Sequence, residues 1–311
     1  MTSYPASPAN SVSSEKAAIL MRRATVLAIL VACCLITFKA LAWWFSDSVA
    51  ILASLLDSGL DMAASVVNLV AVRHALTPAD EEHRFGHGKA EAMAGLGQSL
   101  LVALSAIWII GEATERLLNP HPVVYPGLAL GVMGVSTLAT LGLVLYQRHV
   151  IRLTRSLAIG ADHLHYMSDF MVNIAVIVSI VLSVWFGLTL VDPFFGLVIA
   201  FIIIWGAWRI ISQSWDELMD RELPDDDRAQ IKSLVLGHGD VKGLHDLRTR
   251  SAGQRQFIQF HIELVPDLSI LEAHQISDEV EERVMAAYPK AEVLIHQDPL
   301  GVEHISGLEK V

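Results

Sequence analysis

The sequence predicts a membrane α-helical protein: six transmembrane helices followed by a C-terminal α+β domain. Apolar segments fill the first two thirds of the 311 residues. Of all residues, 53% are hydrophobic and 18% are charged, whereas a soluble chain has about 25% charged residues. The last third is acidic and alternates helical and strand patterns. These observations indicate a membrane unit joined to a small soluble unit.

Each of the six apolar segments is near the ~20 residues that a helix needs to cross a bilayer. Trp43, Trp44 and Phe45 end the first segment, where aromatic side chains favour the membrane interface. Lys39 also lies toward that end, where its ammonium group can snorkel outward. A polar N-terminal tail, residues 1–23, precedes them. The segments are residues 24–45, 49–75, 90–117, 123–147, 157–186 and 190–211.

Basic residues predict the orientation of these segments. Ten basic residues are assigned to one side of the membrane, and Arg116 and Lys39 to the other side. An excess of Lys and Arg marks the cytoplasmic side, so we expect both termini in the cytoplasm. The ten are Lys16, Arg22, Arg23, Arg73, Arg84, Lys89, Arg148, Arg152, Arg155 and Arg209.

The acidic third is expected to fold as a separate unit. Residues 213–311 hold 20 acidic and 10 basic side chains, against 13 and 12 in residues 1–212. This charge argues against a nucleic-acid partner, which requires a basic face. The pattern predicts one sheet with helices on one face. We expect a membrane domain over 24–212, a cytoplasmic domain over 213–300 and a tail over 301–311. The expected elements are helix 225–236, strands 243–250 and 256–265, helix 269–288 and strand 292–296.

Four ionisable side chains lie within the apolar segments at helical spacing. Asp57 and Asp61 are four residues apart, and so are His165 and Asp169, so each pair shares one helix face. An ionisable group at membrane depth costs about 2.5–3.5 kcal/mol and survives with a partner, water or an ion. Three carboxylates and one imidazole suit a divalent metal. Structural hydrogen bonds between helices are the alternative.

A second cluster lies between the second and third apolar segments. Asp80, His83 and His87 fall within eight residues, so two imidazoles and one carboxylate can close on one cation. A polar loop with solvated histidines is an equally good interpretation of this spacing.

A third group lies in the acidic domain. His245, His261, His274, His296 and Asp298 each fall on or beside a different predicted element. Metal ligands and ordinary core or surface histidines are both open interpretations. Lys89 and Asp220 both lie near the cytoplasmic ends of segments, where an ion pair can tie helices or subunits together.

These residues resemble the cation diffusion facilitator family over about residues 20–300. The resemblance implies a homodimer with six transmembrane helices and a ferredoxin-like cytoplasmic domain per subunit, in a bacterial inner membrane. It implies that Zn²⁺ leaves the cytoplasm while protons enter. The motifs that carry it are Ser54–Asp61, Asp80–Glu91, Asp162–Asp169, Gly243–Arg250 and Ile295–Pro299.

The resemblance also implies roles for single residues. Asp57, Asp61, His165 and Asp169 would form the transport site, and Asp80, His83 and His87 a loop site. Asp298 would bridge two Zn²⁺ ions bound by the four histidines of the third group. Lys89 with Asp220 would form a charged interlock at the dimer, and Leu164 a hydrophobic gate.

Two other functions compete with transport. A membrane metallopeptidase needs a motif such as H-E-x-x-H, which the sequence does not contain. A metal sensor with a soluble output domain is the alternative, but ligands deep in the membrane favour passage of an ion over signalling. Zn²⁺ is the expected metal, with Cd²⁺, Fe²⁺ and Mn²⁺ as further candidates.

Overall fold

The computed structural model describes residues 13–46, 49–118, 126–186 and 191–301. It divides into two compact units, one ending at Leu218 and the other beginning at Met219. The first contains six long helices and the second a small sheet with two helices, so the predicted fold class is confirmed. After their predicted locations, we call them the membrane unit and the cytoplasmic unit.

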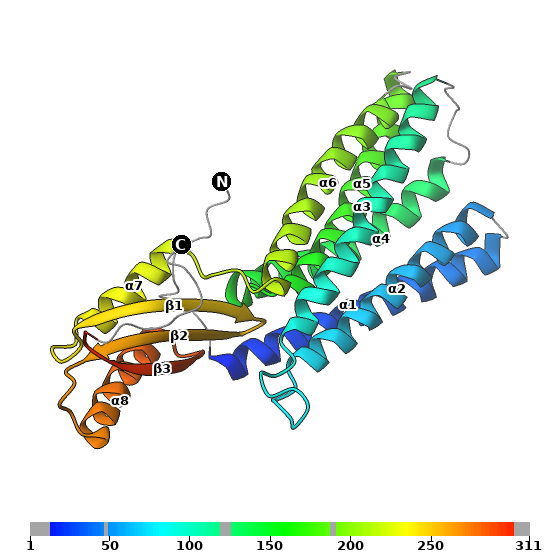
Figure 1. Ribbon diagram of the computed structural model, residues 1–311. Coiled ribbons are helices and arrows are strands. Elements are labelled where there is room, and N and C mark those ends of the chain that lie inside the picture. Colours follow the sequence, from blue (N-terminus) through cyan, green and yellow to red (C-terminus); the bar gives the residue numbers. More distant parts are fainter. Residues whose placement is uncertain (1–12, 47–48, 119–125, 187–190, 302–311) are drawn as a thin grey trace. The chain divides into compact units, whose positions relative to one another are not determined.

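The membrane unit consists of helices α1 to α6 (Figure 1). In the described part of the chain, three helical stretches are long and apolar enough to cross a membrane: Glu15–Leu41, Lys89–Glu115 and Pro193–Leu218. Helix α1 begins before residue 24, because the Ser13 hydroxyl accepts the Lys16 N–H at 3.4 Å and starts the helix in the polar segment. The bounds are α1 Ser14–Ser46, α2 Val49–Ala75, α3 Lys89–Leu118, α4 Pro126–Thr154, α5 Leu157–Phe186 and α6 Val191–Leu218.

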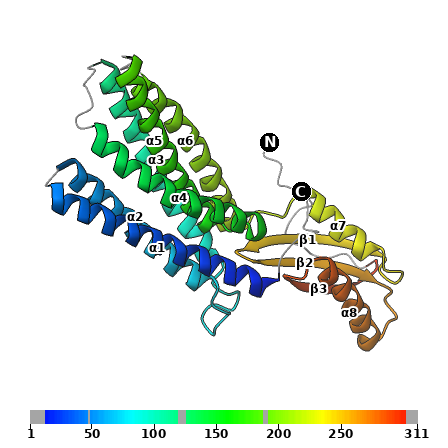
Figure 2. The same cartoon turned by 180° about the vertical axis from the view of Figure 1, so that it is seen from behind.

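Small side chains bring these helices close together. Ala106 of α3 and Ala200 of α6 are fully buried in one cluster with Ile203. Small residues at an interface let helix backbones approach, which stabilises membrane bundles. Helices α1 and α2 lie side by side in both views (Figures 1 and 2). Helix α2 also contacts α5, where the Ser65 and Tyr166 hydroxyls are 2.9 Å apart.

The cytoplasmic unit has the order α-β-β-α-β. Strands β1 and β2 pair antiparallel, and β2 and β3 pair parallel, in the sheet order β1-β2-β3. This is the ferredoxin-like order without its first strand. A capping box starts α8, where bonds from the Ser269 hydroxyl and N–H lower the pKa of Glu272. The bounds are α7 Asp225–Leu236, β1 Gly243–Ala252, β2 Arg255–Leu264, α8 Ile270–Ala287 and β3 Ala291–Pro299.

The side chains of β2 show which face of the sheet is covered by helices and which face is open. Ile258, Phe260 and Ile262 are buried against Ile231 of α7 and Val280 of α8. Both helices therefore pack on one face, as the sequence predicted. Because side chains alternate along a strand, His261 and its even-spaced neighbours lie on the opposite face.

Two isoleucines test this core. Ile231 is fully buried, whereas Ile270 at the start of α8 is 88% exposed. We expect Ile231→Ala to destabilise the cytoplasmic unit by about 2–5 kcal/mol and the matched Ile270→Ala by at most about 0.5 kcal/mol. Amide hydrogen exchange in β2 of the full-length protein measures both. Equal effects of the two substitutions would contradict the assigned core.

Candidate metal centres

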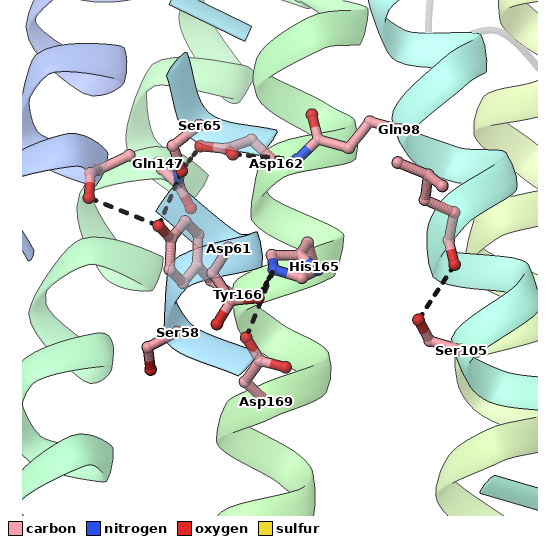
Figure 3. Close-up of polar contacts among 12 residues, drawn as sticks. Ser58, Asp61, Ser65, Gln98, Ser105, Gln147, Asp162, His165, Tyr166 and Asp169 are labelled. Carbon is pink, nitrogen blue, oxygen red and sulfur yellow. Dashed lines mark hydrogen bonds and ion pairs between the residues drawn. The ribbon is translucent and has the colours of Figure 1, made fainter. Parts of the chain in front are cut away.

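Three of the four predicted intramembrane ligands converge between α2 and α5 (Figure 3). His165 Nε2 lies 2.9 Å from Asp61 Oδ1 and 3.7 Å from Asp169 Oδ2. One ligand atom from each residue falls within 4.8 Å of the other two. All three side chains are partly buried. Two carboxylates and one imidazole thus face a common point between the two helices.

The fourth predicted ligand is Asp57, on α2 one turn before Asp61. Its side chain lies outside the described residues, so its place in this site stays a prediction. A tetrahedral Zn²⁺ takes four ligands, and the described cluster supplies three. The spacing of Asp57 suits the fourth position because residues i and i+4 share a helix face.

The contact of His165 with Asp61 makes proton and metal compete. The imidazole bonds the carboxylate through Nε2, and the lone pair of that atom is what a metal would bind. A proton on Nε2 and a metal at Nε2 exclude each other. The cluster can therefore exchange one cation for another at a single ring atom.

Lys39 of α1 is part of the polar surroundings of this cluster. Only 8% of it is exposed, and its ammonium group donates to the Ser58 hydroxyl at 2.7 Å. The expectation that Lys39 snorkels outward was therefore wrong. Ser58 precedes Asp61 by three residues on α2, so a hydrogen-bond partner near the acidic face holds the lysine inside.

The proposed gate residue Leu164 faces α3 and α6. It packs against the buried cluster of Val102 and Ile203. A Cβ atom on Gly206 would lie 2.7 Å from Leu164 Cδ1, so a larger residue at position 206 would displace this side chain. The packing fits a hydrophobic plug beside the cluster, and the gate role itself stays a prediction.

The structure brings the three predicted loop residues together. Asp80 Oδ1 lies 3.2 Å from His83 Nδ1, and Asp80 Oδ2 lies 3.3 Å from His87 Nε2. The backbone N–H of His83, bonded to the carboxylate, lowers the pKa of Asp80. His87 is buried and contacts the His74 ring at 4.4 Å between centroids. Asp80 and His83 are exposed, so a cation can reach this cluster from solvent.

On the open face of the sheet, three predicted histidines form a row. His245, His261 and His296 are register partners across β1, β2 and β3. Asp298 is buried beside them, with Oδ2 at 3.1 Å from His245 Nε2 and 2.8 Å from His261 Nδ1. Its other oxygen, Oδ1, lies 3.1 Å from His296 Nε2. A carboxylate whose two oxygens lie near different histidines is suited to bridge two metal ions.

The fifth predicted ligand does not join this row. His274 of α8 is exposed and pairs with Asp278 at 3.5 Å, so its role as a ligand stays a prediction. Glu263 does join it, because its Oε1 lies 3.2 Å from His245 Nδ1. A carboxylate bonded to the second ring nitrogen orients a histidine ligand. Alternation from His261 to Glu263 is a sequence signal that predicts this residue.

The two residues of the predicted interlock, Lys89 and Asp220, belong to different units. Within the membrane unit, Lys89 donates to the Leu218 carbonyl at 3.3 Å. Within the cytoplasmic unit, Asp220 bonds Arg250 at 3.3 Å. A pair between Lys89 and Asp220 stays a prediction.

Comparison with known proteins identifies the family. Residues 25–219 match the cation efflux transmembrane domain, and residues 223–300 match the cytoplasmic domain of cation efflux proteins. The cation-efflux pump FieF of Cronobacter sakazakii is 44% identical over 283 residues, which cover 91% of this chain and 94% of that protein. FieF of Salmonella agona is 43% identical over the same shares. The predicted resemblance to the cation diffusion facilitator family is therefore confirmed.

A solved structure, the zinc form of CzrB, is 33% identical with a TM-score of 0.26. The match covers 27% of this chain and 98% of the CzrB chain. The two family models and the FieF relatives span nearly all of the sequence. The protein therefore belongs to the cation efflux family, the cation diffusion facilitators.

Proposed function

We propose that the protein exports a divalent cation, principally Zn²⁺, across the bacterial inner membrane in exchange for protons. The observation that carries this proposal is the convergence of Asp61, His165 and Asp169 inside the membrane unit. Family membership supports cation efflux. One imidazole among carboxylates supports Zn²⁺ or Cd²⁺, because Mn²⁺ favours oxygen ligands throughout.

The exchange follows from the contacts of His165. A metal entering from the cytoplasm takes the Nε2 lone pair and the carboxylate oxygens of Asp61 and Asp169. The helices then expose the cluster to the outside, where protons bind these groups and release the metal. Return of the protonated site to the cytoplasmic side completes alternating access. Leu164, packed against Gly206, would close one side of the site while the other is open.

The other two clusters would support this cycle. The loop residues Asp80, His83 and His87 would bind a cation between α2 and α3 and deliver it or regulate transport. The row of His245, His261 and His296 with Asp298 would hold two ions. We further propose a homodimer through the cytoplasmic domains, with both termini in the cytoplasm.

The transport site is tested by single substitutions. We expect Asp61→Asn and Asp169→Asn each to lower Zn²⁺ transport by at least about 100-fold, which exceeds the loss from an outer-shell partner. The matched control is Glu112→Gln on α3, an exposed carboxylate away from the cluster. Uptake into vesicles containing the purified protein and a zinc-sensitive dye, under a pH gradient, gives the rates. Wild-type rates in both variants would refute the site.

The loop site predicts a pH dependence. Because its pKa is lowered, Asp80 stays ionised at mildly acidic pH, so the imidazoles govern metal binding. Free imidazole has a pKa of about 6.5, and each proton that a metal displaces costs about tenfold in affinity per pH unit below it. Loop affinity should therefore fall from pH 7.5 to pH 5.5.

Calorimetric titration of the wild type at both pH values measures this fall. The difference from the His83→Ala/His87→Ala variant isolates the loop contribution. A loop affinity that is the same at both pH values would rule out histidine ligation here.

Asp298 provides the test of the cytoplasmic site. Its two oxygens serve different histidines, so Asp298→Asn should lower the metal content by two ions per chain. Asp267→Asn, an exposed carboxylate of the same unit, should leave the content unchanged. Elemental analysis after dialysis against buffered Zn²⁺ gives the count. Equal metal content in the two variants would argue against Asp298 as the bridge.

A further inference from the structure

We propose a second cation site in the membrane unit, an inner station that receives the metal before it reaches the transport site. It consists of Asp162, Gln98, Gln147 and Asn68, one residue from each of α2 to α5. Its ligand is a divalent cation that keeps part of its water shell. The inference rests on the transport function proposed above and adds a site distinct from the three metal clusters.

Asp162 is the centre of this station. It is fully buried, and its carboxylate accepts the Gln98 Nε2–H at 3.0 Å and the Gln147 Nε2–H at 2.6 Å. The two amides come from α3 and α4, and Figure 3 shows Asp162 above His165 on α5. A buried carboxylate in a membrane helix is costly. The presence of Asp162 at this position therefore indicates a functional site.

Two amides of the station have unused bonding capacity. The Gln147 oxygen and both polar atoms of Asn68 are buried, and none has a hydrogen-bond partner among the described residues. Asn68 is 2% exposed and Gln147 is fully buried. An unsatisfied buried polar atom costs about 1–3 kcal/mol, so such a set calls for a ligand.

Contacts between α2 and α5 place Asn68 at the level of Asp162. Ser65 of α2 bonds Tyr166 of α5, and about two turns further along, Val72 of α2 packs in one cluster with Ile159 of α5. Asn68 is one turn from Ser65 and one turn from Val72. Asp162 is likewise one turn from Tyr166 and one turn from Ile159. Residues three or four apart share a helix face, so Asn68 and Asp162 lie in the same α2–α5 interface.

The donor set selects the kind of ligand. Rotating a glutamine amide by half a turn exchanges its NH₂ for its oxygen, so Gln98 and Gln147 can turn oxygens toward a cation at Asp162. One carboxylate with carboxamide oxygens is a weak, oxygen-only set. It suits passage of a partly hydrated ion, whereas the imidazole of His165 provides tighter binding.

The station lies on the proposed entry side of the transport site. Asp162 precedes His165 by three residues, toward the end of α5 that begins at Leu157. Arg148, Arg152 and Arg155 flank that end, which the charge distribution assigns to the cytoplasm. A cation that passes Asp162 therefore reaches His165 within one helical turn.

The test separates capture of the metal from its translocation. Initial rates of Zn²⁺ uptake into vesicles are measured against Zn²⁺ concentration for Asp162→Asn and Asn68→Leu. Loss of an entry site lowers kcat/KM and leaves kcat unchanged where the conformational step limits turnover. We expect KM to rise about tenfold in each variant, the effect of one lost charge-assisted contact. The proton-to-metal ratio should stay at the wild-type value.

Ser136→Ala is the matched control. Its hydroxyl on α4 is also buried without a partner, and it is not part of the station. This variant should keep the wild-type KM. Asn68→Leu removes an unpartnered amide at similar volume, so it folds even if Asp162→Asn does not.

Three results would overturn the station: an unchanged KM in Asn68→Leu, a lower kcat at unchanged KM, or an altered proton-to-metal ratio. A lower kcat at unchanged KM would make Asp162 a structural tie between helices. An altered proton-to-metal ratio would make Asp162 a proton carrier. Asp61→Asn distinguishes this failure from failure of the proposed function. If Asp61→Asn still transports, the function is wrong, whereas if only the station variants behave as wild type, the station alone is wrong.

Discussion

The contact between His165 of α5 and Asp61 of α2 is the interaction on which the membrane unit depends. It neutralises groups that could not stay ionised and alone at membrane depth. At 2.9 Å it also ties two helices that are far apart in the sequence. A metal must break this contact to bind, so stability without metal and affinity for metal oppose each other at one ring nitrogen. This opposition is what a site needs if it is to release its ion.

Helix α5 places the other polar groups in relation to that contact. Asp162, His165 and Asp169 are separated by three and four residues and so line one face of the helix. Tyr166, beside them, is buried and bonds Ser65. Leu164 points to a different neighbour, the glycine of α6. One helix thus contributes a polar face toward α2 and an apolar side chain toward α6.

Helical spacing made the membrane cluster predictable, because i, i+4 pairs fix which side chains share a face. The strands of the cytoplasmic unit were also predicted within three residues of their observed ends. Pairing register was not predictable, since the alignment of His245, His261 and His296 depends on the bulge in β1 and the parallel pairing of β3. The exposed position of His274 and the inward bond of Lys39 depend on packing between elements. Nothing in the local sequence of either residue reports such packing.

The donor sets of the two units differ in a way that matches their proposed tasks. The described membrane cluster has one imidazole and two carboxylates, whereas the cytoplasmic row has three imidazoles around one buried carboxylate. Imidazole-rich sets favour Zn²⁺, and Glu263 further orients His245. Gly243 lies directly against Glu263. A Cβ atom at position 243 would come within 2.6 Å of the Glu263 carboxylate. The cytoplasmic row would therefore hold a bound metal in place, while the membrane cluster shares its only described imidazole with a carboxylate that competes for it.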